Sequence, residues 1–285
     1  MTYIADMARL MRPKSWIKNF LVALPVFFSL NLFSDDAFVR TVWAFLGFCL
    51  ISSGVYAMND VIDARYDESR YDKKNRPVAA GRIKPMHAVL FSCLLFIPGV
   101  SCLGCFASSR SGMLGMGYIA VNMLYTLCLK NFPVADVGCI AAGFVLRVYA
   151  GAAACGVMVS EWLFLTVVAA SCFMGFGKRY GEMALGDPER WRKSVQGYDP
   201  GFLRGAIFLS AGLAVGFYSL WSILNSRNHL VFSVPVLLFL LYRYLLDIFK
   251  QVGDGDPVRI FYGDRVLTVG LGVYGAMMFM LLYFL

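Results

Sequence analysis

Apolar stretches long enough to cross a lipid bilayer recur along the whole chain, and this pattern constrains the fold more than any other feature. Hydrophobic residues make up 59% of the 285 residues and charged residues 15%, whereas soluble proteins carry about 25% charged residues. The sequence therefore predicts an all-α polytopic membrane protein that forms a single domain over 1–285. About nine transmembrane helices are expected, at 19–33, 39–58, 87–107, 112–129, 134–154, 161–177, 202–224, 229–249 and 265–284.

The loops between these segments differ sharply in charge. One side holds the N-terminus and the loops 59–86, 130–133, 178–201 and 250–264. The two longest of these loops are rich in basic residues, namely Arg65, Arg70, Lys73, Lys74, Arg76, Arg82, Lys84, Lys178, Arg179, Arg190, Arg192 and Lys193. The cations of the other side are Arg40, Arg110 and Arg227.

This asymmetry predicts the orientation of the chain in a cell membrane. The positive-inside rule places the N-terminus and the basic loops in the cytosol, and nine spans then place Leu285 on the far side. We attribute the net charge of +8 to loops that lie beside the lipid bilayer and not to nucleic-acid binding.

An acidic motif follows the second predicted span. Asn59, Asp60, Asp63 and Asp67 share one broad face if the helix continues through them. Three carboxylates on one face repel one another unless a cation lies among them, and hard oxygen ligands favour Mg²⁺, or Mn²⁺ in its place. The simpler interpretation is a solvated helix end. Basic residues that suit a phosphate come shortly afterwards, at Lys74 and Arg76.

A second polar cluster lies at the end of the sixth predicted span. Lys178, Arg179, Tyr180 and Glu182 place two cations, a phenol and a carboxylate on one helix end. Lys178 and Glu182 are spaced i, i+4, so a plain surface ion pair is the simpler interpretation.

These residues resemble the motifs of the UbiA superfamily of intramembrane prenyltransferases. The first motif of that family, NDxxDxxxD, is complete at Asn59, Asp60, Asp63 and Asp67. The resemblance implies a fold of nine transmembrane helices around a central cavity with a cytosolic cap. It also implies that Mg²⁺ is held by Asp60, Asp63 and Asp67.

The second motif departs from most of the family, which carries a DxxxD where this chain has Lys178-Arg179-Tyr180-Gly181-Glu182. That substitution, with Arg12-Pro13-Lys14-Ser15-Trp16-Ile17-Lys18-Asn19 near the start, resembles the decaprenyl-phosphate phosphoribosyltransferase branch. Asp136, Arg147 and the pair Asp264-Arg265 agree with it.

The branch implies a Mg-dependent glycosyltransferase that moves a 5-phosphoribosyl group from phosphoribosyl diphosphate to a polyprenyl phosphate of the decaprenyl type and releases diphosphate. A phosphate monoester is already ionised at neutral pH, because its second pKa is about 6, so the reaction needs no strong general base. Neutralising the diphosphate would fall to the metal on the three aspartates, whereas Lys178 and Arg179 would suit the 5-phosphate of the donor. Glu182 is included among the expected catalytic residues.

Other polar residues have two interpretations. Lys14 and Lys18 either hold the acceptor phosphate or anchor their helix, and Lys130, with Tyr125 one turn inside, is similar. Asn19 belongs with Lys14 and Lys18 as an expected substrate-binding residue. Arg147 lies inside a span, where a lone cation is costly, so we expect an ion pair between Arg147 and Asp136.

Two alternative functions stay open. The first is transfer of a prenyl group from a prenyl diphosphate to an aromatic acceptor, because the acidic motif serves either donor. The second is a lipid transporter or flippase, although transporters concentrate polar groups near the bilayer midplane and this chain has them at the span ends. Association of the chain into a homo-oligomer is left open.

Overall fold

The computed structural model describes residues 3–68, 73–184, 193–224, 228–251 and 255–285, and within these ranges all regular secondary structure is helical. Arg70, Arg190, Arg192 and Arg227 lie outside the described residues. The helices group into two compact units, which are described separately. Unit 1 comprises Met1–Lys130 and Leu146–Met158, and unit 2 comprises Asn131–Val145 and Val159–Leu285. The single domain over 1–285 stays a prediction.

Within the described residues, seven helices are long and apolar enough to cross a membrane, so the prediction of a polytopic helical protein is confirmed. They are α3 (Asp35–Ile62), α5 (Pro85–Ser101) continued by the π-helical turn η2 (Cys102–Ala107), α7 (Ala135–Cys155), α8 (Glu161–Ala184), α10 (Pro200–Leu224), α11 (Ser233–Phe249) preceded by η5 (Asn228–Phe232), and α13 (Arg265–Tyr283).

The other two predicted spans are less regular or less apolar. The segment 112–129 falls largely on α6 (Ser109–Leu127), a continuous helix that is not among the seven. The segment 19–33 includes the end of the 3₁₀ helix η1 (Pro13–Ala23), the short helix α2 (Leu24–Phe28) and Leu30 with φ 63°. A 3₁₀ stretch of eleven residues is unusual, because such helices seldom exceed three or four residues.

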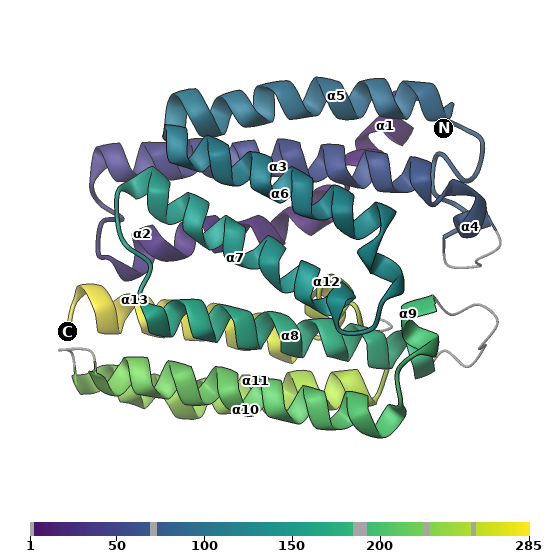
Figure 1. The fold of residues 1–285 in the computed structure, drawn as a ribbon. Coiled ribbons are helices and arrows are strands. Elements are labelled where there is room, and N and C mark those ends of the chain that lie inside the picture. The colour runs from purple at the N-terminus through teal and green to yellow at the C-terminus, as the bar shows by residue number, and fades with distance from the viewer. Residues whose placement is uncertain (1–2, 69–72, 185–192, 225–227, 252–254) are drawn as a thin grey trace. The chain divides into compact units, whose positions relative to one another are not determined.

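In unit 1, α3 packs along α5, with α1 (Tyr3–Met11), η1 and α6 also in contact with it (Figure 1). Small residues allow this close approach, as is common between membrane helices. A Cβ added to Gly99 of α5 would lie 2.6 Å from Ile51 Cγ2 on α3. The core around this contact includes Phe48, Ile51 and Leu103.

A close backbone approach in unit 1 joins η1 to the second half of α7. A Cβ added to Gly151 would lie 1.9 Å from the carbonyl oxygen of Val22, so this position has room for glycine alone. The same contact brings Asn19 of η1 within hydrogen-bonding distance of Arg147 on α7.

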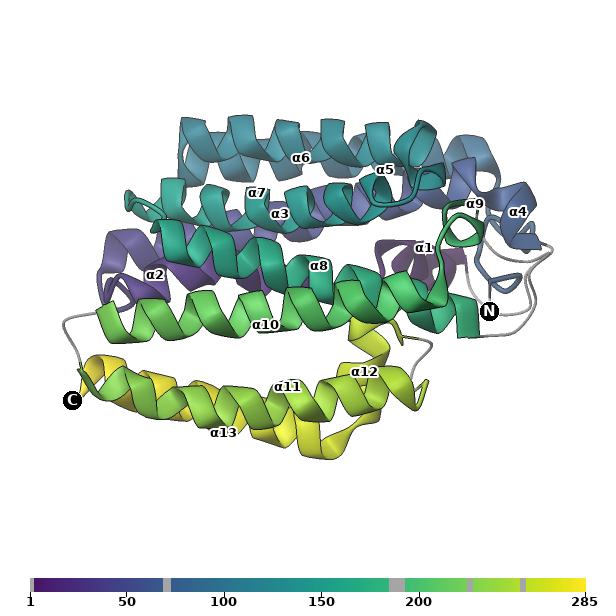
Figure 2. The ribbon, with the colours of Figure 1, turned by 60° about the horizontal axis from the view of Figure 1, so that its bottom comes forward.

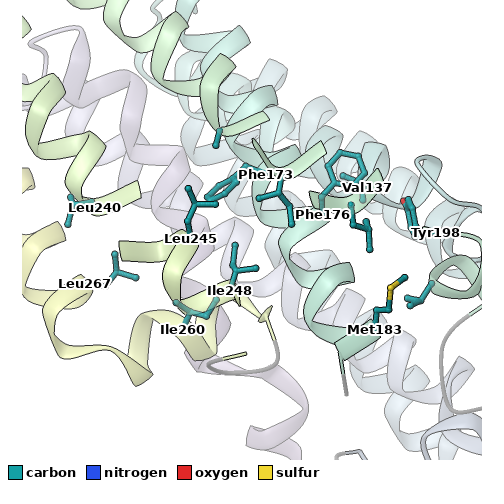
Figure 3. Packing of buried hydrophobic residues seen from close by; sticks show 14 residues of the cluster. Val137, Phe173, Phe176, Met183, Tyr198, Leu240, Leu245, Ile248, Ile260 and Leu267 are labelled. Carbon is teal, nitrogen blue, oxygen red and sulfur yellow. The ribbon is translucent and has the colours of Figure 1, made fainter. Parts of the chain in front are cut away.

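In unit 2, α8 packs along α10, and α11 packs against α13 (Figure 2). Buried side chains from these helices and from α12 (Pro257–Gly263) form a hydrophobic core, in which Phe173 and Phe176 of α8, Leu245 and Ile248 of α11 and Ile260 of α12 take part (Figure 3). This core holds the C-terminal end of α8, and the residues of the second polar cluster lie on that end.

Gly151→Ala should destabilise the protein, because the added methyl group has no space against Val22. Overpacking of this kind costs about 1–3 kcal/mol. The matched control is Gly138→Ala on the same helix, since a Cβ at Gly138 meets no atom within 4 Å. Thermal unfolding of the detergent-purified chain should show a lower Tm for Gly151→Ala and no loss for Gly138→Ala. Equal Tm values for the two variants would contradict the close contact.

Candidate functional site

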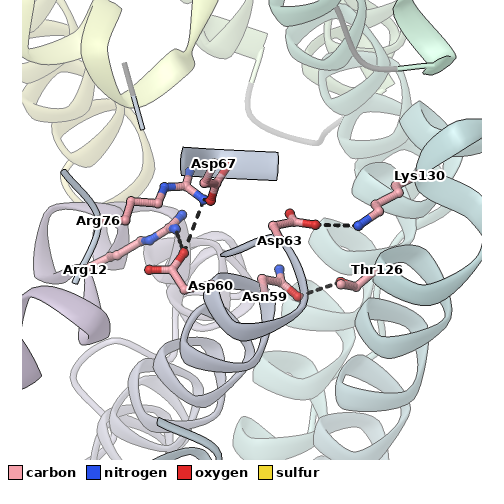
Figure 4. A network of polar contacts seen from close by, with 8 residues as sticks. All are labelled: Arg12, Asn59, Asp60, Asp63, Asp67, Arg76, Thr126 and Lys130. Atoms are coloured by element: carbon pink, nitrogen blue, oxygen red, sulfur yellow. Dashed lines mark hydrogen bonds and ion pairs between the residues drawn. The ribbon is translucent and has the colours of Figure 1, made fainter. Parts of the chain in front are cut away.

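The acidic motif of unit 1 does not lie on one uninterrupted helix. Helix α3 ends at Ile62, and Asp63 forms its C-cap with φ −91° and ψ 0°. A short helix, α4 (Ala64–Glu68), follows and carries Asp67. Hydrogen bonds bridge the break, from Asp63 N to Asn59 O at 2.9 Å and from Asp67 N to Asp63 O at 2.8 Å. The expected common face is therefore split into two parts (Figure 4).

The first part joins Asp60 and Asp67, which are both buried. Arg76 Nη1 lies 3.2 Å from Asp60 Oδ1 and 2.5 Å from Asp67 Oδ2, so one guanidinium nitrogen bridges the two carboxylates. Arg12 forms an ion pair with the same Asp60 oxygen and lies 4.9 Å from the centre of the Tyr56 ring. Burial raises the pKa of the Asp67 carboxyl, and the positive charges of Arg76 and Lys73 oppose this rise.

The second part joins the motif to the end of α6 and the turn η3 (Leu129–Asn131). Lys130 Nζ lies 2.5 Å from Asp63 Oδ1. Thr126 Oγ1 donates a hydrogen bond to Asn59 Oδ1 at 2.5 Å. Tyr125, which was expected near Lys130, is half-buried on α6. In this structure Lys130 thus contacts the acidic motif, a role that neither interpretation of its sequence anticipated.

The residues of the acidic motif suit a divalent cation in their chemistry. They offer carboxylate and amide oxygens, which Mg²⁺ prefers. Asp60 and Asp67 already approach one positively charged atom between them, on Arg76. Within the described residues, however, no three His, Cys, Asp or Glu side chains are gathered closely enough to hold a metal ion. A three-aspartate site would therefore require Asp63 to leave Lys130.

The expected substrate-binding residues of the N-terminal segment differ in exposure. Lys14 is exposed, Lys18 is half-buried and Asn19 is fully buried. Asn19 donates a hydrogen bond to Ser52 Oγ at 3.2 Å and accepts one from Arg147 Nε at 2.8 Å. Asn19 thus joins η1 to α3 and α7. Lys74, on the loop before Arg76, is exposed.

The expected ion pair between Arg147 and Asp136 is wrong. Positions 136 and 147 are eleven residues apart on α7, which separates them by about 16 Å along the helix axis. Arg147 instead bonds Asn19 and the hydroxyl of Tyr118, 2.8 Å from Nη2, and its guanidinium lies 4.5 Å from the centre of the Tyr118 ring. Asp136 pairs with Arg179.

In unit 2, Arg179 is the centre of a buried charge network at the end of α8. Its side chain has 0% exposure, its Nε lies 2.7 Å from Asp136 Oδ2, and its Nη1 forms an ion pair with Glu182. Tyr198 donates a hydrogen bond to Asp136 Oδ1 at 2.7 Å and accepts one from Val134 N at 2.6 Å. Burial raises the pKa of the Tyr198 phenol, so this group stays protonated as a donor at neutral pH.

Lys178, next to Arg179 in sequence, is in a different environment. Its side chain is 30% exposed and its Nζ lies 3.0 Å from Asp256 Oδ2. Asp256 also caps α12 by accepting a hydrogen bond from Val258 N at 3.0 Å. Gly255 brings this segment onto α8: its φ is +70°, and a Cβ there would lie 2.6 Å from the carbonyl oxygen of Gly177. The simpler interpretation, an i, i+4 ion pair between Lys178 and Glu182, does not hold, because Lys178 pairs with Asp256 and Glu182 pairs with Arg179.

Tyr180, the remaining expected residue of this cluster, contacts side chains of α10 and α11. Its hydroxyl accepts a hydrogen bond from Arg204 Nη2 at 3.4 Å, and its ring packs edge-on against Phe249, with the ring centres 5.3 Å apart.

Arg12 and Asp256 were not predicted as site residues, and Asp136 was predicted to pair with Arg147 and not to take part in the site. Arg12 precedes Asp60 by 48 residues, and Asp256 follows Lys178 by 78 residues. No periodicity connects residues at such separations. The signal available for Arg12 was its place beside Lys14 and Lys18 in a basic N-terminal segment.

Comparison with known proteins identifies the family. The profile of the UbiA prenyltransferase family matches residues 20–189, more than half of the chain. Two relatives described as decaprenyl-phosphate phosphoribosyltransferases are similar over most of their length. The protein from Corynebacterium glutamicum is 32% identical over 282 residues, which cover 93% of this chain and 83% of the relative. The protein from Mycolicibacterium smegmatis is 30% identical over 299 residues, which cover 95% and 93%.

A solved structure has the same fold. A UbiA homolog from Archaeoglobus fulgidus bound to GPP and Mg2+ aligns with a TM-score of 0.77 at 17% identity, covering 97% of this chain and 99% of that one. The chain therefore belongs to the UbiA prenyltransferase family, and it is a transferase with the fold of that family.

Arg179→Met should destabilise the protein far more than Lys178→Met. The first change leaves Asp136 and Glu182 without their buried cation, and breaking a buried pair costs about 3–5 kcal/mol. The second removes a partly exposed pair, which is worth about 0–1 kcal/mol. Thermal unfolding in detergent measures both, and a similar Tm for the two variants would show that Arg179 does not have this anchoring role.

Proposed function

We propose that this chain transfers a 5-phosphoribosyl group from phosphoribosyl diphosphate to a polyprenyl phosphate of the decaprenyl type, with release of diphosphate and with Mg²⁺ as cofactor. The acceptor phosphate oxygen forms a bond to C1 of the ribose while the bond from C1 to the diphosphate oxygen breaks. The acceptor is ionised at neutral pH, so the protein has to position two anions and neutralise the leaving group.

The observation that carries the proposal is the basic end of α8. Lys178 is a partly exposed cation on this helix end, and the acids beside it are engaged by Lys178 itself and by Arg179. A prenyl diphosphate has one anionic end, whereas phosphoribosyl diphosphate has a second anion, its 5-phosphate. A basic residue in the second motif suits that additional anion. The two relatives at 30–32% identity support this choice of donor, since both are described as decaprenyl-phosphate phosphoribosyltransferases.

The acidic motif is the proposed site for the metal and the diphosphate. Asp60, Asp63 and Asp67 would hold Mg²⁺, which neutralises the diphosphate as it leaves. The structure from A. fulgidus is described as bound to Mg2+, which supports the choice of metal. Arg76 lies beside these carboxylates and Lys74 lies two residues before it, so both are proposed to bind the diphosphate.

The two cations of α8 receive different proposed roles because their burial differs. Lys178 is proposed to bind the 5-phosphate directly. Arg179 is enclosed by Asp136 and Glu182, so we propose that it positions Lys178 and orients Glu182 without touching the substrate. Tyr180 lies on the same helix end, and its proposed role is to contact the donor sugar.

The phosphate of the acceptor is proposed to bind basic residues of unit 1. Lys14 and Lys18 are accessible cations on η1, and Asn19 holds that helix in place. Tyr125 lies near the end of α6, and Lys130 lies on the following turn η3, where it contacts Asp63. The proposed role of Lys14, Lys18 and Tyr125 is to bring the lipid phosphate to the donor at the membrane surface, and Lys130 is proposed to bind substrate phosphate beside the acidic motif.

The proposed topology has nine spans in a cell membrane, with the N-terminus and the loops of both motifs in the cytosol. The basic residues of these loops support it through the positive-inside rule. Seven candidate spans lie within the described residues, and the proposal adds α6 and the segment formed by η1 and α2.

Membranes that contain the chain should transfer radiolabel from phosphoribosyl diphosphate to decaprenyl phosphate. Lys178→Ala should raise KM for phosphoribosyl diphosphate by about tenfold to a hundredfold, because a charge-assisted hydrogen bond to phosphate is worth roughly 1.5–3 kcal/mol. Lys250→Ala is the matched control, since Lys250 is an exposed lysine at the end of α11 in the same unit.

The competing donor is tested in the same membranes with geranyl diphosphate and an aromatic acceptor. Transfer from geranyl diphosphate without transfer from phosphoribosyl diphosphate would overturn the proposal in favour of aromatic prenyl transfer. A lack of transfer from both donors, in membranes where a relative such as the C. glutamicum enzyme is active, would also count against it.

Single cysteines placed in a cysteine-free background should reveal the topology. Positions 74 and 199 should react with a membrane-impermeant reagent from the cytosolic side, and position 285 from the opposite side. Labelling of position 285 from the cytosol would show that the count of nine spans is wrong.

A further inference from the structure

The carboxylates of the acidic motif are already neutralised by the chain itself. Three basic side chains accompany the three aspartates: Arg12 and Arg76 contact Asp60, Arg76 also contacts Asp67, and Lys130 contacts Asp63 (Figure 4). Each aspartate therefore has a basic side chain in direct contact, and Lys73 adds a further positive charge that acts on Asp67. A divalent cation and these basic groups need the same carboxylate oxygens, so they compete for them.

The contacts of Arg76 are not those of a purely structural arginine. A guanidinium binds a carboxylate best through a fork of parallel hydrogen bonds. Arg76 instead uses one nitrogen to bridge two carboxylates, and Arg12 contacts the oxygen of Asp60 that Arg76 also contacts. Two guanidinium groups thus converge on one oxygen atom, where they repel each other.

Arg82 provides the contrast within unit 1. Its Nε lies 3.1 Å from both carboxylate oxygens of Asp6, and its Nη2 donates to the carbonyl oxygen of Asn75 at 2.7 Å. Arg82 therefore serves a single carboxylate, which Arg9 also contacts, and one backbone group, and these contacts anchor the loop to α1. The difference is that Arg76 bridges two carboxylates of the acidic motif.

Exposure shows which groups are able to move. Asp60 and Asp67 are 2% and 1% exposed and Asp63 is 14% exposed, whereas the side chains of Arg12, Arg76 and Lys130 are 19–28% exposed. Asp60 and Asp67 lie on α3 and α4, whereas the cations are long side chains that contact them and are themselves partly open to solvent. The cations can therefore swing away while the carboxylates remain in place.

We propose that Arg12, Arg76 and Lys130 are resident counter-cations of the acidic motif: they leave the carboxylates when a divalent cation binds there, and they then bind the anionic substrate. Metal and anion binding are consequently coupled. The metal removes the need for cations at the carboxylates, and the anion provides new partners for the released cations. Because coupling between two ligands is reciprocal, each strengthens the binding of the other. This inference rests on the proposed function for the identity of the anion, a diphosphate.

The test uses the full chain in phosphatidylcholine nanodiscs, with Mn²⁺ and inorganic diphosphate as probes. Arg76→Met removes the bridging cation and keeps an unbranched side chain. Without diphosphate, the variant should bind Mn²⁺ about tenfold more tightly than the parent, as measured by electron paramagnetic resonance of free Mn²⁺. At a fixed, saturating concentration of free Mn²⁺, it should bind diphosphate about tenfold more weakly. Each tenfold change corresponds to about 1.4 kcal/mol.

Arg82→Met is the matched control, because it removes an arginine from a buried aspartate of the same unit outside the acidic motif. It should leave both affinities unchanged. If thermal unfolding shows that Arg76→Met does not fold, Arg12→Met and Lys130→Met are measured in the same way. Each of these variants should bind Mn²⁺ more tightly and diphosphate more weakly than the parent.

Mn²⁺ affinity that stays unchanged or falls in these variants overturns the exchange of counter-cations, and so does tighter Mn²⁺ binding with unchanged diphosphate binding. Because neither measurement uses phosphoribosyl diphosphate, failure here is separate from failure of the proposed function. If the parent transfers the phosphoribosyl group but the variants show no opposite shifts in Mn²⁺ and diphosphate affinity, this inference is wrong and the proposed function stands.

Discussion

A carboxylate that is buried at the end of a membrane helix is costly without a cation beside it, and both polar centres of this protein place a cation there. In unit 1 the buried acids Asp60 and Asp67 are covered by Arg12 and Arg76. In unit 2 Asp136 lies against Arg179. The pairs of Arg12 with Asp60 and of Arg179 with Asp136 join segments that are distant in sequence, so at these two places charge neutralisation and the packing of helix ends are achieved by the same contacts.

The burial of each cation separates anchoring groups from groups that are available to a substrate. Arg179 is completely enclosed and is held by two carboxylates. Moving its side chain would leave both carboxylates without a cation in an apolar environment. Lys178 and Arg76 reach the same kinds of partners from partly exposed positions. An incoming phosphate can approach Lys178, whose carboxylate partner is itself partly exposed, whereas release of Arg76 requires another cation at Asp60 and Asp67, and Arg179 offers no access.

Much of the fold could be predicted because its signals are local. A long apolar run must form a helix in the bilayer, where every backbone group needs an internal hydrogen bond. The predicted segments 87–107 and 134–154 accordingly agree with α5–η2 and α7 within a few residues. The irregular η1 and the break at Asp63 could not be predicted in this way. Both depend on packing and capping contacts, such as Gly151 against Val22 and Lys130 on Asp63.

The sequence by itself determined the residue types at the candidate site and their grouping on helix ends, because the spacing of Asn59, Asp60, Asp63 and Asp67, and of Lys178 to Glu182, is a property of neighbouring residues. Only the tertiary structure decided the partner of each charge. It assigned Arg12 to Asp60, Asp256 to Lys178 and Asn19 to Arg147, and it separated Arg147 from Asp136. The physical reason is that a charge pairs with whatever group packing brings within about 4 Å, and helix packing brings together residues whose separation along the chain carries no periodic signal.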